Sequence, residues 1–590
     1  MILADLWPGP QRPAPTRAVV DVAAGAVAGG VACPARGLVV DPPAVSDTAQ
    51  GGERRWAPGR LWTWGLLALV LLFAAGVRWR LLSVPLERDE GEYAYAGQLI
   101  LQGVPPYSLA YNMKLPGTYA AYALIMALFG QTIRGIHLGL LLLNAATILV
   151  EFLLARRLFG EYVGVAAAAC YALLSLGQPV LGVFAHATHF VVLPALAGLL
   201  LLLRALESGR LRTLFLSGLL LGLGFVMKQH GGFFVLFGLF YLAWERLRAG
   251  APAWRPLVRE AAVFSIAAAV PFALTCAALA LAGVFGDFWF WTFEYAWAYA
   301  TEQPLAAGMR ALSDAIEVVI GPSALVWGIA GIGLIALVLR DETRGRHVFT
   351  VGFLLASIAS ICPGLYFREH YFVLLLPAAA LLAGLAVDSL RRALLQTPLA
   401  GSAPAVAASL FLAVMLVTIY SQAAFLFGLT PRQASRHAYG LSPFPEAVEI
   451  ARYLEAHTPE SERIAVLGSE PEIFFYAGRR SATGYIYMYG LMEDQPYALK
   501  MQQQMIREIE TSAPRYLVLV NVPSSWTARL DSVRLVFEWY QAYARDAFEK
   551  VGLVDLVSTD EIDYFWDREA AARSPRSPYY IEILRRKPDS

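Results

Sequence analysis

Long apolar segments recur along most of the chain, and they constrain its fold more than any other feature. A helix needs about 20 mostly apolar residues to cross a bilayer. Runs of this kind begin near residue 62 and continue to about residue 427. Of the 590 residues, 57% are hydrophobic and only 16% are charged, whereas an average soluble domain has about 25% charged residues. We therefore predict a polytopic α-helical membrane protein.

The apolar segments can be placed individually by their hydropathy. Their number predicts about eleven transmembrane helices. The predicted spans are about 62–83, 136–155, 162–180, 188–204, 211–227, 231–244, 260–284, 318–339, 348–364, 370–388 and 404–427.

Arginines gather at alternate ends of these segments, which orients the chain because cytoplasmic loops are enriched in Lys and Arg. The arginine-bearing ends lie near residues 54–60, 156–157, 204–212, 246–259, 340–346 and 391–392. All of them fall on one face of the predicted scheme. We therefore expect a multi-pass protein of the cell membrane with a cytoplasmic N-terminus and an extracytoplasmic C-terminal region.

Two regions differ from the apolar segments. Residues 1–60 are rich in Ala, Pro and Gly without a persistent period, which predicts a disordered tail. Residues 61–428 form the predicted membrane domain. In residues 429–590, "RIAVLG" and "RYLVLV" are typical of buried strands, while "EAVEIARYLEAH" and "ALKMQQQMIREIETS" are typical of helices. This alternation predicts a soluble α/β domain.

Charge and cysteine usage exclude several classes of function. The net charge is only +1, so no global field favours binding to nucleic acid. The cysteines form no CxxC pair, and we interpret them as small core residues without a disulfide framework or zinc site. They are Cys33, Cys170, Cys276 and Cys362.

A cluster of carboxylates follows the first predicted span, in "VPLERDEGEYAYAGQ". It contains Glu87, Asp89, Glu90 and Glu92. Acidic residues favour the first turn of a helix, so the stretch is consistent with a helix start that Asp89 could cap. A carboxylate at the edge of the membrane could instead accept a proton from an incoming hydroxyl group.

Three cations lie on the outer face, where positive charge is disfavoured. They are Lys114, Lys228 and Arg368. Lys114 lies within residues 103–130, whose prolines and tyrosines predict one or two helices along the membrane surface. Each cation could pair with a nearby carboxylate, as Arg368 could with Glu369, or together they could bind a phosphate group.

The order of these motifs resembles that of the GT-C glycosyltransferases. The similar segments are "RDEGEYAYAGQLILQG", "NMKLPGTYAAYALIMALFG", "ARRLFG", "GFVMKQHGG" and "YFREHYFVLLLPAAALLAG". They resemble most the branch with the dolichyl-phosphate-mannose protein mannosyltransferases and the bacterial lipid A aminoarabinose transferase. The chain departs from the branch where a Lys-Pro-Pro segment is typical, because it has Lys114-Leu115-Pro116.

The resemblance implies a reaction and roles for residues. A monosaccharide would pass from a polyprenyl-phosphate donor to an envelope lipid, glycan or protein, by inverting attack at the anomeric carbon and with no cofactor. Asp89 would be the general base and Glu90 its catalytic neighbour, while Lys114, Lys228 and Arg368 would contact the donor phosphate. The remaining predicted substrate-binding residues are Glu92, His189, Glu294, His370 and Tyr371.

Other interpretations remain open from the sequence. His186 and His189 share one helical face, but their spacing alone is a weak metal signal, and we expect hydrogen-bonding roles and no metal site. A transporter or flippase would also have many spans, although the unusual residues gather on one face and no inverted repeat is evident. A receptor or scaffold that acts through its outer domain is the third alternative.

Overall fold

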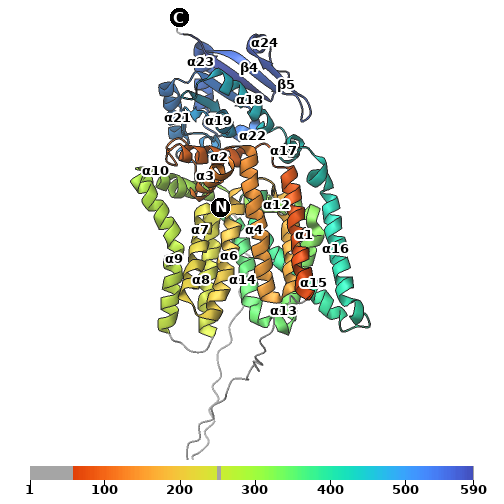
Figure 1. Cartoon of the computed structure of the whole chain (residues 1–590). Coiled ribbons are helices and arrows are strands. Elements are labelled where there is room, and N and C mark those ends of the chain that lie inside the picture. Colours follow the sequence, from red (N-terminus) through yellow and green to blue (C-terminus); the bar gives the residue numbers. More distant parts are fainter. Residues whose placement is uncertain (1–57, 249–253, 589–590) are drawn as a thin grey trace, which may run out of the picture. The chain divides into compact units, whose positions relative to one another are not determined.

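The computed structural model describes residues 58–248 and 254–588, and the structural statements below concern that part of the chain. Upright helices form a bundle, and a sheet domain lies at one end of it (Figure 1). The tail that the sequence predicts to be disordered falls outside the described residues as far as residue 57, and Cys33 lies within that part. Cys170 is buried, as predicted, whereas Cys276 and Cys362 are half-buried.

Every predicted apolar segment overlaps one helix of the bundle. These helices are α1 (Pro58–Arg80), α4 (Ile133–Phe159), α5 (Glu161–Leu174), α6 (Ala187–Ser208), α7 (Leu211–Met227), α8 (Gly232–Arg248), α9 (Trp254–Leu281), α13 (Ala324–Leu339), α14 (His347–Ile361), α15 (Leu376–Leu394) and α16 (Ala403–Ser421).

The lengths of these helices test the membrane prediction. Within 58–248 and 254–588, 6 helical segments are long and apolar enough to cross a membrane. They are Leu61–Arg80, Ile133–Phe159, Ala187–Ser208, Trp254–Leu281, Leu305–Leu339 and Ala400–Ser421. Several other apolar helices are shorter. A polytopic helical membrane protein is therefore confirmed, while the number of about eleven spans stays a prediction.

Glycine allows two of these helices to approach closely. A Cβ atom on Gly333 of α13 would lie 1.8 Å from the carbonyl oxygen of Leu382 on α15. Real atoms cannot come so near, so any larger residue at this position would force the helices apart. Two residues earlier, on the opposite face of α13, Gly331 has nothing within 4 Å of its Cβ position.

We expect Gly333→Ala to lower the stability of the bundle by about 1–3 kcal/mol, the usual effect of overpacking a core. Gly331→Ala is the matched control and should have little effect, because its methyl group meets open space. Thermal unfolding of both variants in detergent measures the difference. Equal unfolding temperatures would show that the contact between α13 and α15 is not as close as described.

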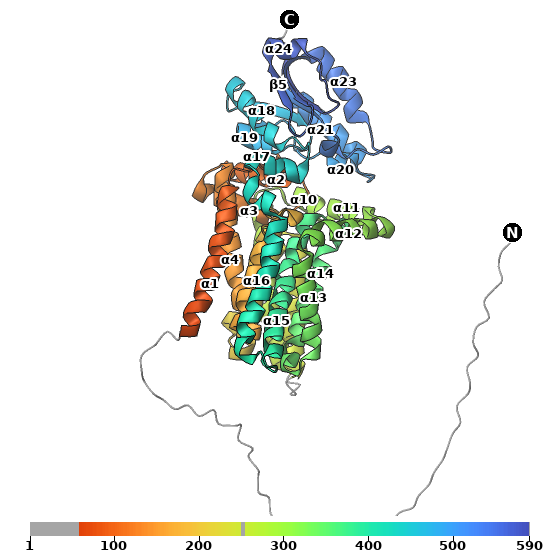
Figure 2. The same cartoon turned by 90° about the vertical axis from the view of Figure 1, so that its right-hand side faces the viewer.

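Several short helices lie across the end of the bundle rather than along it (Figure 2). The segment 103–130, predicted as one or two helices, contains α3 after an irregular loop. The crosswise helices are α2 (Arg88–Leu101), α3 (Gly117–Phe129), α10 (Phe285–Trp289), the π-helix η3 (Phe290–Tyr295), α11 (Ala296–Glu302) and α12 (Leu305–Ile320). These helices and the loops between them contribute residues 111–118 and 291–300 to the lining of the candidate site.

The carboxylate cluster begins α2, as its sequence predicts, but the cap is Glu87 and not Asp89. The side chain of Glu87 accepts a hydrogen bond from the backbone N–H of Glu90, at 2.9 Å. Glu90 Oε2 accepts one from the N–H of Glu87 in return, at 3.2 Å. This reciprocal capping box satisfies two helix-end donors and leaves the carboxylate of Asp89 available for other contacts.

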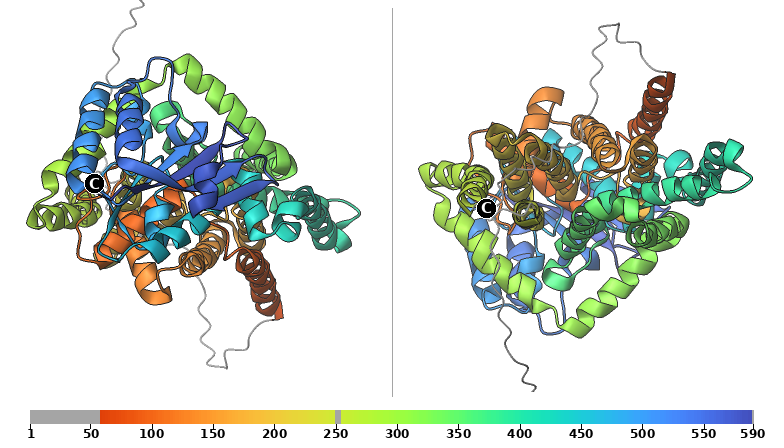
Figure 3. Two further views of the ribbon diagram at one scale, coloured as in Figure 1. Left: turned by 90° about the horizontal axis from the view of Figure 1, so that it is seen from above. Right: turned by 90° about the horizontal axis from the view of Figure 1, so that it is seen from below.

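The C-terminal region is an α/β domain with one six-stranded sheet, which lies over the end of the bundle in the view from above (Figure 3). The strand order is β2-β1-β3-β6-β4-β5. The strands are β1 (Arg463–Leu467), β2 (Arg480–Ser481), β3 (Tyr516–Asn521), β4 (Phe548–Leu556), β5 (Ile562–Trp566) and β6 (Tyr580–Arg586). The predicted strands β1 and β3 pair in parallel, whereas β3, β6, β4 and β5 pair antiparallel.

Helices pack around this sheet. The predicted helices in "EAVEIARYLEAH" and "ALKMQQQMIREIETS" are α18 and α21. The helices of the domain are α17 (Pro431–Tyr439), α18 (Phe444–His457), α19 (Glu472–Ala477), α20 (Tyr489–Met492), α21 (Ala498–Ser512), α22 (Pro523–Trp526), α23 (Leu535–Ala547) and α24 (Asp567–Ala572). The short α20 and the segment before it reach down to the crosswise helices and enter the site.

Candidate functional site

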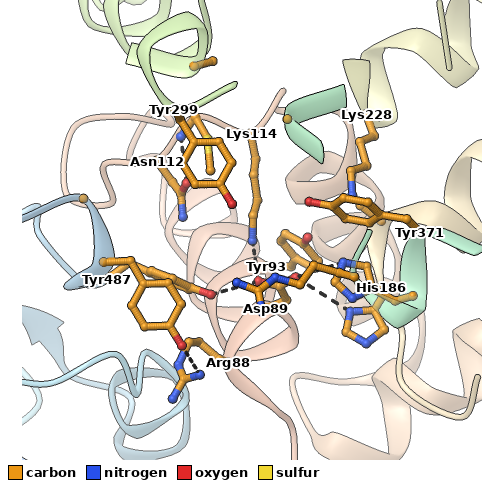
Figure 4. Close-up of a pocket in the computed structure, with 18 of the residues that line it drawn as sticks. Arg88, Asp89, Tyr93, Asn112, Lys114, His186, Lys228, Tyr299, Tyr371 and Tyr487 are labelled. Atoms are coloured by element: carbon orange, nitrogen blue, oxygen red, sulfur yellow. Dashed lines mark hydrogen bonds and ion pairs between the residues drawn. The ribbon is translucent and has the colours of Figure 1, made fainter. Parts of the chain in front are cut away.

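A cavity of about 720 Å³ lies where the bundle, the crosswise helices and the C-terminal domain meet. Its walls come from segments far apart in the sequence, and Figure 4 shows ten labelled lining residues. Apart from Val318 and Met501, the lining residues lie within 87–93, 111–118, 178–187, 227–230, 291–300, 363–371, 438–442, 485–493 and 524–527. All of these segments lie outside the upright helices or at their ends.

Asp89 is the centre of the polar network in this cavity. Its Oδ1 lies 2.6 Å from Nζ of Lys114 and accepts a 3.3 Å hydrogen bond from the hydroxyl of Tyr487. Its Oδ2 lies 3.8 Å from His186 Nδ1 and 3.9 Å from His370 Nε2. Burial opposes the charge, but Lys114 and His186 outweigh it and hold the pKa of Asp89 well below its usual range. Asp89 is therefore an ionised carboxylate that faces the cavity.

Lys114 pairs with carboxylates in this structure. Its Nζ contacts Asp89 Oδ1 at 2.6 Å and Glu92 Oε2 at 2.8 Å, and it lies 4.7 Å from the ring centroid of Tyr93. Of the two roles considered for Lys114, pairing with a nearby carboxylate or binding a phosphate, this structure shows the first. One of the three ammonium hydrogens remains for a ligand, so Lys114 would join a phosphate site only as a shared contact.

Glu90 and Glu92 are fully buried and do not line the cavity. Glu90 Oε1 contacts His137 Nε2 at 2.9 Å and accepts a hydrogen bond from the N–H of Ala185. Glu92 accepts hydrogen bonds from Asn112 Nδ2 at 2.7 Å and from the hydroxyl of Tyr119. Both carboxylates hold α2 against its neighbours, so their position corrects the expectation that they touch the substrate.

Lys228 and Arg368 face the cavity without a carboxylate partner in the described part of the chain. Lys228 Nζ lies 3.9 Å above the ring of Tyr371, and the guanidinium of Arg368 lies 5.7 Å from the ring of Tyr366. Neither side chain makes a hydrogen bond or an ion pair among the described residues, and Arg368 does not pair with Glu369 there. Burial lowers the pKa of the Lys228 ammonium to about 7, so an unpaired positive charge here is costly unless a ligand anion neutralises it.

The other predicted contacts divide into two groups. His370 and Tyr371 line the cavity, and the ring of His370 stacks on that of His186 with a 4.2 Å centroid distance. His189 is buried inside α6, and Glu294 is exposed on the outside of η3. Neither lines the cavity, because the turn of each helix directs its side chain elsewhere.

The prediction missed the residues that the C-terminal domain contributes. Tyr487, Tyr489 and Glu493 line the cavity, and Arg88 binds the domain beside them. The guanidinium of Arg88 contacts the hydroxyl of Tyr489, the carbonyl oxygen of Ser469 and the carboxylate of Glu470. The tyrosines of "YIYMYG" were the only signal in the sequence, since alternating aromatic residues before a short helix are unusual on a solvent-exposed surface.

One group of side chains could hold a metal ion. Ligand atoms of Asp89, His186 and His370 lie within 4.8 Å of one another, the only such group of three found among the described residues. A carboxylate and two neutral imidazoles are suitable ligands for zinc. The ammonium of Lys114, 2.6 Å from the same carboxylate, opposes a second cation there. No step proposed below depends on an ion at this position.

The raised pKa of Glu493 leads us to expect that the stability of the folded chain depends on pH. Burial raises its pKa to about 7 from an ordinary 4.5, although the hydroxyl of Tyr295 donates to its Oε2 at 2.7 Å. Between these two values the folded chain holds a proton that the unfolded chain has lost. This contribution to stability therefore falls as pH rises through the window and is constant above it.

We expect Glu493→Gln to remove this loss, which is on the order of 2–3 kcal/mol for a shift of this size. The variant should gain stability relative to the parent as pH rises from 5 to 8. Thermal unfolding of both proteins across this range measures the effect. Parallel curves would contradict a raised pKa at this position.

Comparisons with known proteins agree with this architecture. Residues 114–281 match the family described as dolichyl-phosphate-mannose-protein mannosyltransferase. An undecaprenyl phosphate-α-4-amino-4-deoxy-L-arabinose arabinosyl transferase from Pseudomonas aeruginosa is 31% identical over 248 residues, 39% of this chain and 43% of the relative. The same transferase from Pseudomonas paraeruginosa is 29% identical over 356 residues, 56% of this chain and 61% of the relative. The matches thus span about half of the relatives' length.

Solved structures show the same fold over more of the chain. ArnT from Cupriavidus metallidurans, bound to undecaprenyl phosphate, has a TM-score of 0.56 at 16% identity and covers 89% of this chain and 98% of its own. The archaeal oligosaccharyltransferase AglB from Archaeoglobus fulgidus, in complex with an inhibitory peptide and a dolichol-phosphate, has a TM-score of 0.53 at 13% identity, with coverages of 86% and 75%.

The names of these proteins agree with the predicted enzyme class, a glycosyltransferase. The resemblance predicted from the sequence is confirmed: this chain is a multi-pass membrane protein with the GT-C glycosyltransferase fold, similar to the dolichyl-phosphate-mannose protein mannosyltransferases and to the lipid A aminoarabinose transferases.

Proposed function

We propose that this chain is a membrane glycosyltransferase that moves a monosaccharide from a polyprenyl-phosphate donor to an acceptor hydroxyl group. The cavity carries this proposal. It is lined by the ionised carboxylate of Asp89 and by two basic residues, Lys228 and Arg368, that have no carboxylate partner among the described residues. A base and a phosphate-binding group are what such a transfer requires. The names of the relatives support the donor class.

The reaction would use these residues as follows. Lys228 and Arg368 bind the donor phosphate and stabilise the charge that develops on it as a leaving group. The acceptor oxygen attacks the anomeric carbon from the opposite side, and its proton passes to Asp89. The new C–O bond forms as the bond to phosphate breaks, and the polyprenyl phosphate leaves with the electron pair. His370 and Tyr371 contact the donor beside the cations.

The positions of the parts in the membrane belong to the same proposal. We propose a membrane domain at 61–428 with about eleven spans and an extracytoplasmic domain at 429–590. With the N-terminus in the cytoplasm, the cavity would lie at the outer surface of the cell membrane. The arginine distribution supports this orientation. The acceptor would be an envelope lipid, glycan or protein.

Proteoliposomes test this function against transport. They should contain the full chain and a radiolabelled undecaprenyl-phosphate sugar, together with a membrane extract as the source of acceptors. We expect loss of labelled lipid donor and transfer of label to a new product. Movement of intact labelled lipid between leaflets, with no new product, would support the flippase alternative and reject the proposal.

A further inference from the structure

The two halves of the cavity differ in charge. The half formed by the bundle and the crosswise helices contributes all the lysines and arginines of the lining, which are Arg88, Lys114, Lys228 and Arg368, together with the acids Glu87, Asp89 and Glu369. Among the described residues after Tyr439, none that lines the cavity is a Lys or Arg, and Glu493 is the only acidic one. An anionic ligand therefore belongs to the first half, and the second half suits a ligand without a phosphate group.

Aromatic rings with polar atoms line the boundary between the two halves. Tyr485 belongs to the C-terminal domain, whereas Tyr111, Trp291 and Tyr295 come from the crosswise segments that face it. Trp291 and Tyr111 stack at a 5.5 Å centroid distance, and Trp291 packs edge-on against Tyr295 at 5.3 Å. Tyr485 lies 5.1 Å from Tyr111, and all four rings line the cavity. Aromatic faces bind apolar C–H surfaces while tyrosine hydroxyls form hydrogen bonds. A sugar ring presents both kinds of surface.

Among the described residues, no protein group donates a hydrogen bond to one of the two carboxylate oxygens of Glu493. Its Oε2 accepts a hydrogen bond from Tyr295, but Oε1 makes none among the described residues. The side chain lines the cavity, and no step of the proposed reaction involves it. A ligand hydroxyl group would satisfy this oxygen.

Tyr487 connects this half of the cavity to the reacting groups. It donates a hydrogen bond to Asp89 Oδ1 at 3.3 Å, and its ring lies 5.4 Å from Lys114 Nζ. An acceptor held on this side would present its hydroxyl to Asp89. The donor phosphate, held by Lys228 and Arg368, could then leave from the far side of the anomeric carbon, as inversion requires.

We propose that the C-terminal domain provides the acceptor subsite, that this subsite takes an uncharged carbohydrate, and that Glu493 and Tyr487 bind its hydroxyl groups. The inference rests on the proposed function, because it names the acceptor class for that reaction. It also gives the C-terminal domain a direct part in the site.

Binding measurements test this subsite without knowledge of the natural acceptor. The full chain in lipid nanodiscs would be titrated by saturation-transfer NMR with four probes. These are methyl α-D-mannopyranoside, methyl β-L-arabinopyranoside, mannose 1-phosphate and a Ser/Thr-rich peptide. We expect at least one methyl glycoside to bind, also with undecaprenyl phosphate present, because the two ligands occupy different halves of the cavity.

Variants assign this binding to the subsite. Glu493→Ala and Tyr487→Phe should each weaken glycoside binding roughly five- to tenfold, the effect of losing one hydrogen bond. Tyr579→Phe is the matched control, because Tyr579 does not line the cavity. Retained thermal unfolding and retained binding of undecaprenyl phosphate would show that both cavity variants are folded.

The two proposals fail separately in this experiment. If neither glycoside binds, if both variants bind glycosides as the parent does, or if only the sugar phosphate or the peptide responds to the substitutions, the carbohydrate subsite is wrong. If the parent does not bind undecaprenyl phosphate, the proposed function is wrong, whatever the glycosides do.

Discussion

Asp89→Asn should lower the rate of sugar transfer by about 10³-fold, because an amide cannot accept the proton of the acceptor hydroxyl. The substitution keeps the shape of the side chain, and Lys114 keeps its ion pair with Glu92 at 2.8 Å. We therefore expect the variant to fold. It should bind undecaprenyl phosphate at least as well as the parent, since one negative charge has been removed near the phosphate.

A matched control separates this effect from general damage. Asp314 is exposed on α12 and does not line the cavity, so Asp314→Asn should transfer sugar at the parental rate. The measurement is transfer from a radiolabelled undecaprenyl-phosphate sugar at saturating donor. Parental activity in Asp89→Asn would exclude this carboxylate as the base.

Loss of both unpaired cations should abolish measurable binding of the lipid phosphate. A hydrogen bond to a charged group contributes about 1.5–3 kcal/mol, so Lys228→Ala and Arg368→Ala should each weaken binding of undecaprenyl phosphate about 10- to 100-fold. If the two residues bind independently, the double variant should weaken binding by the product of the two factors.

The double variant needs its own control, for which Arg452 is suitable. Arg452 is exposed in α18, where it pairs with Glu449 at 2.8 Å, and it does not line the cavity. Arg452→Ala should leave lipid binding unchanged. Native mass spectrometry or a fluorescent lipid titration would measure these affinities. Undiminished binding in the double variant would place the phosphate elsewhere.

The sequence predicts the bundle well because its pattern is set by the membrane. Apolar segments of about 20 residues have few alternatives to a helix, and every predicted segment overlaps one. The antiparallel part of the C-terminal sheet was not predicted. β4, β5 and β6 lie close in sequence without a strict alternation, and β6 pairs with β3 across about sixty intervening residues.

Only part of the candidate site could be predicted from the sequence, because burial and long-range contacts cannot be read from spacing along the chain. Lys228 and Arg368 stood out because they break the charge pattern of the outer face, and the structure brings both to one cavity with Asp89. Spacing along the chain cannot reveal which acids are buried, so Glu90 and Glu92 looked equivalent to Asp89. Tyr487 and Glu493 lie about 400 residues beyond Asp89, and only the fold brings them to it.

A structure of the full chain with undecaprenyl phosphate tests the central claim most directly. We predict that the phosphate lies in the cavity, within hydrogen-bonding distance of Lys228 and Arg368, with the carboxylate of Asp89 facing the position of the sugar. A phosphate bound outside this cavity, or one whose oxygens contact neither cation, would contradict the account.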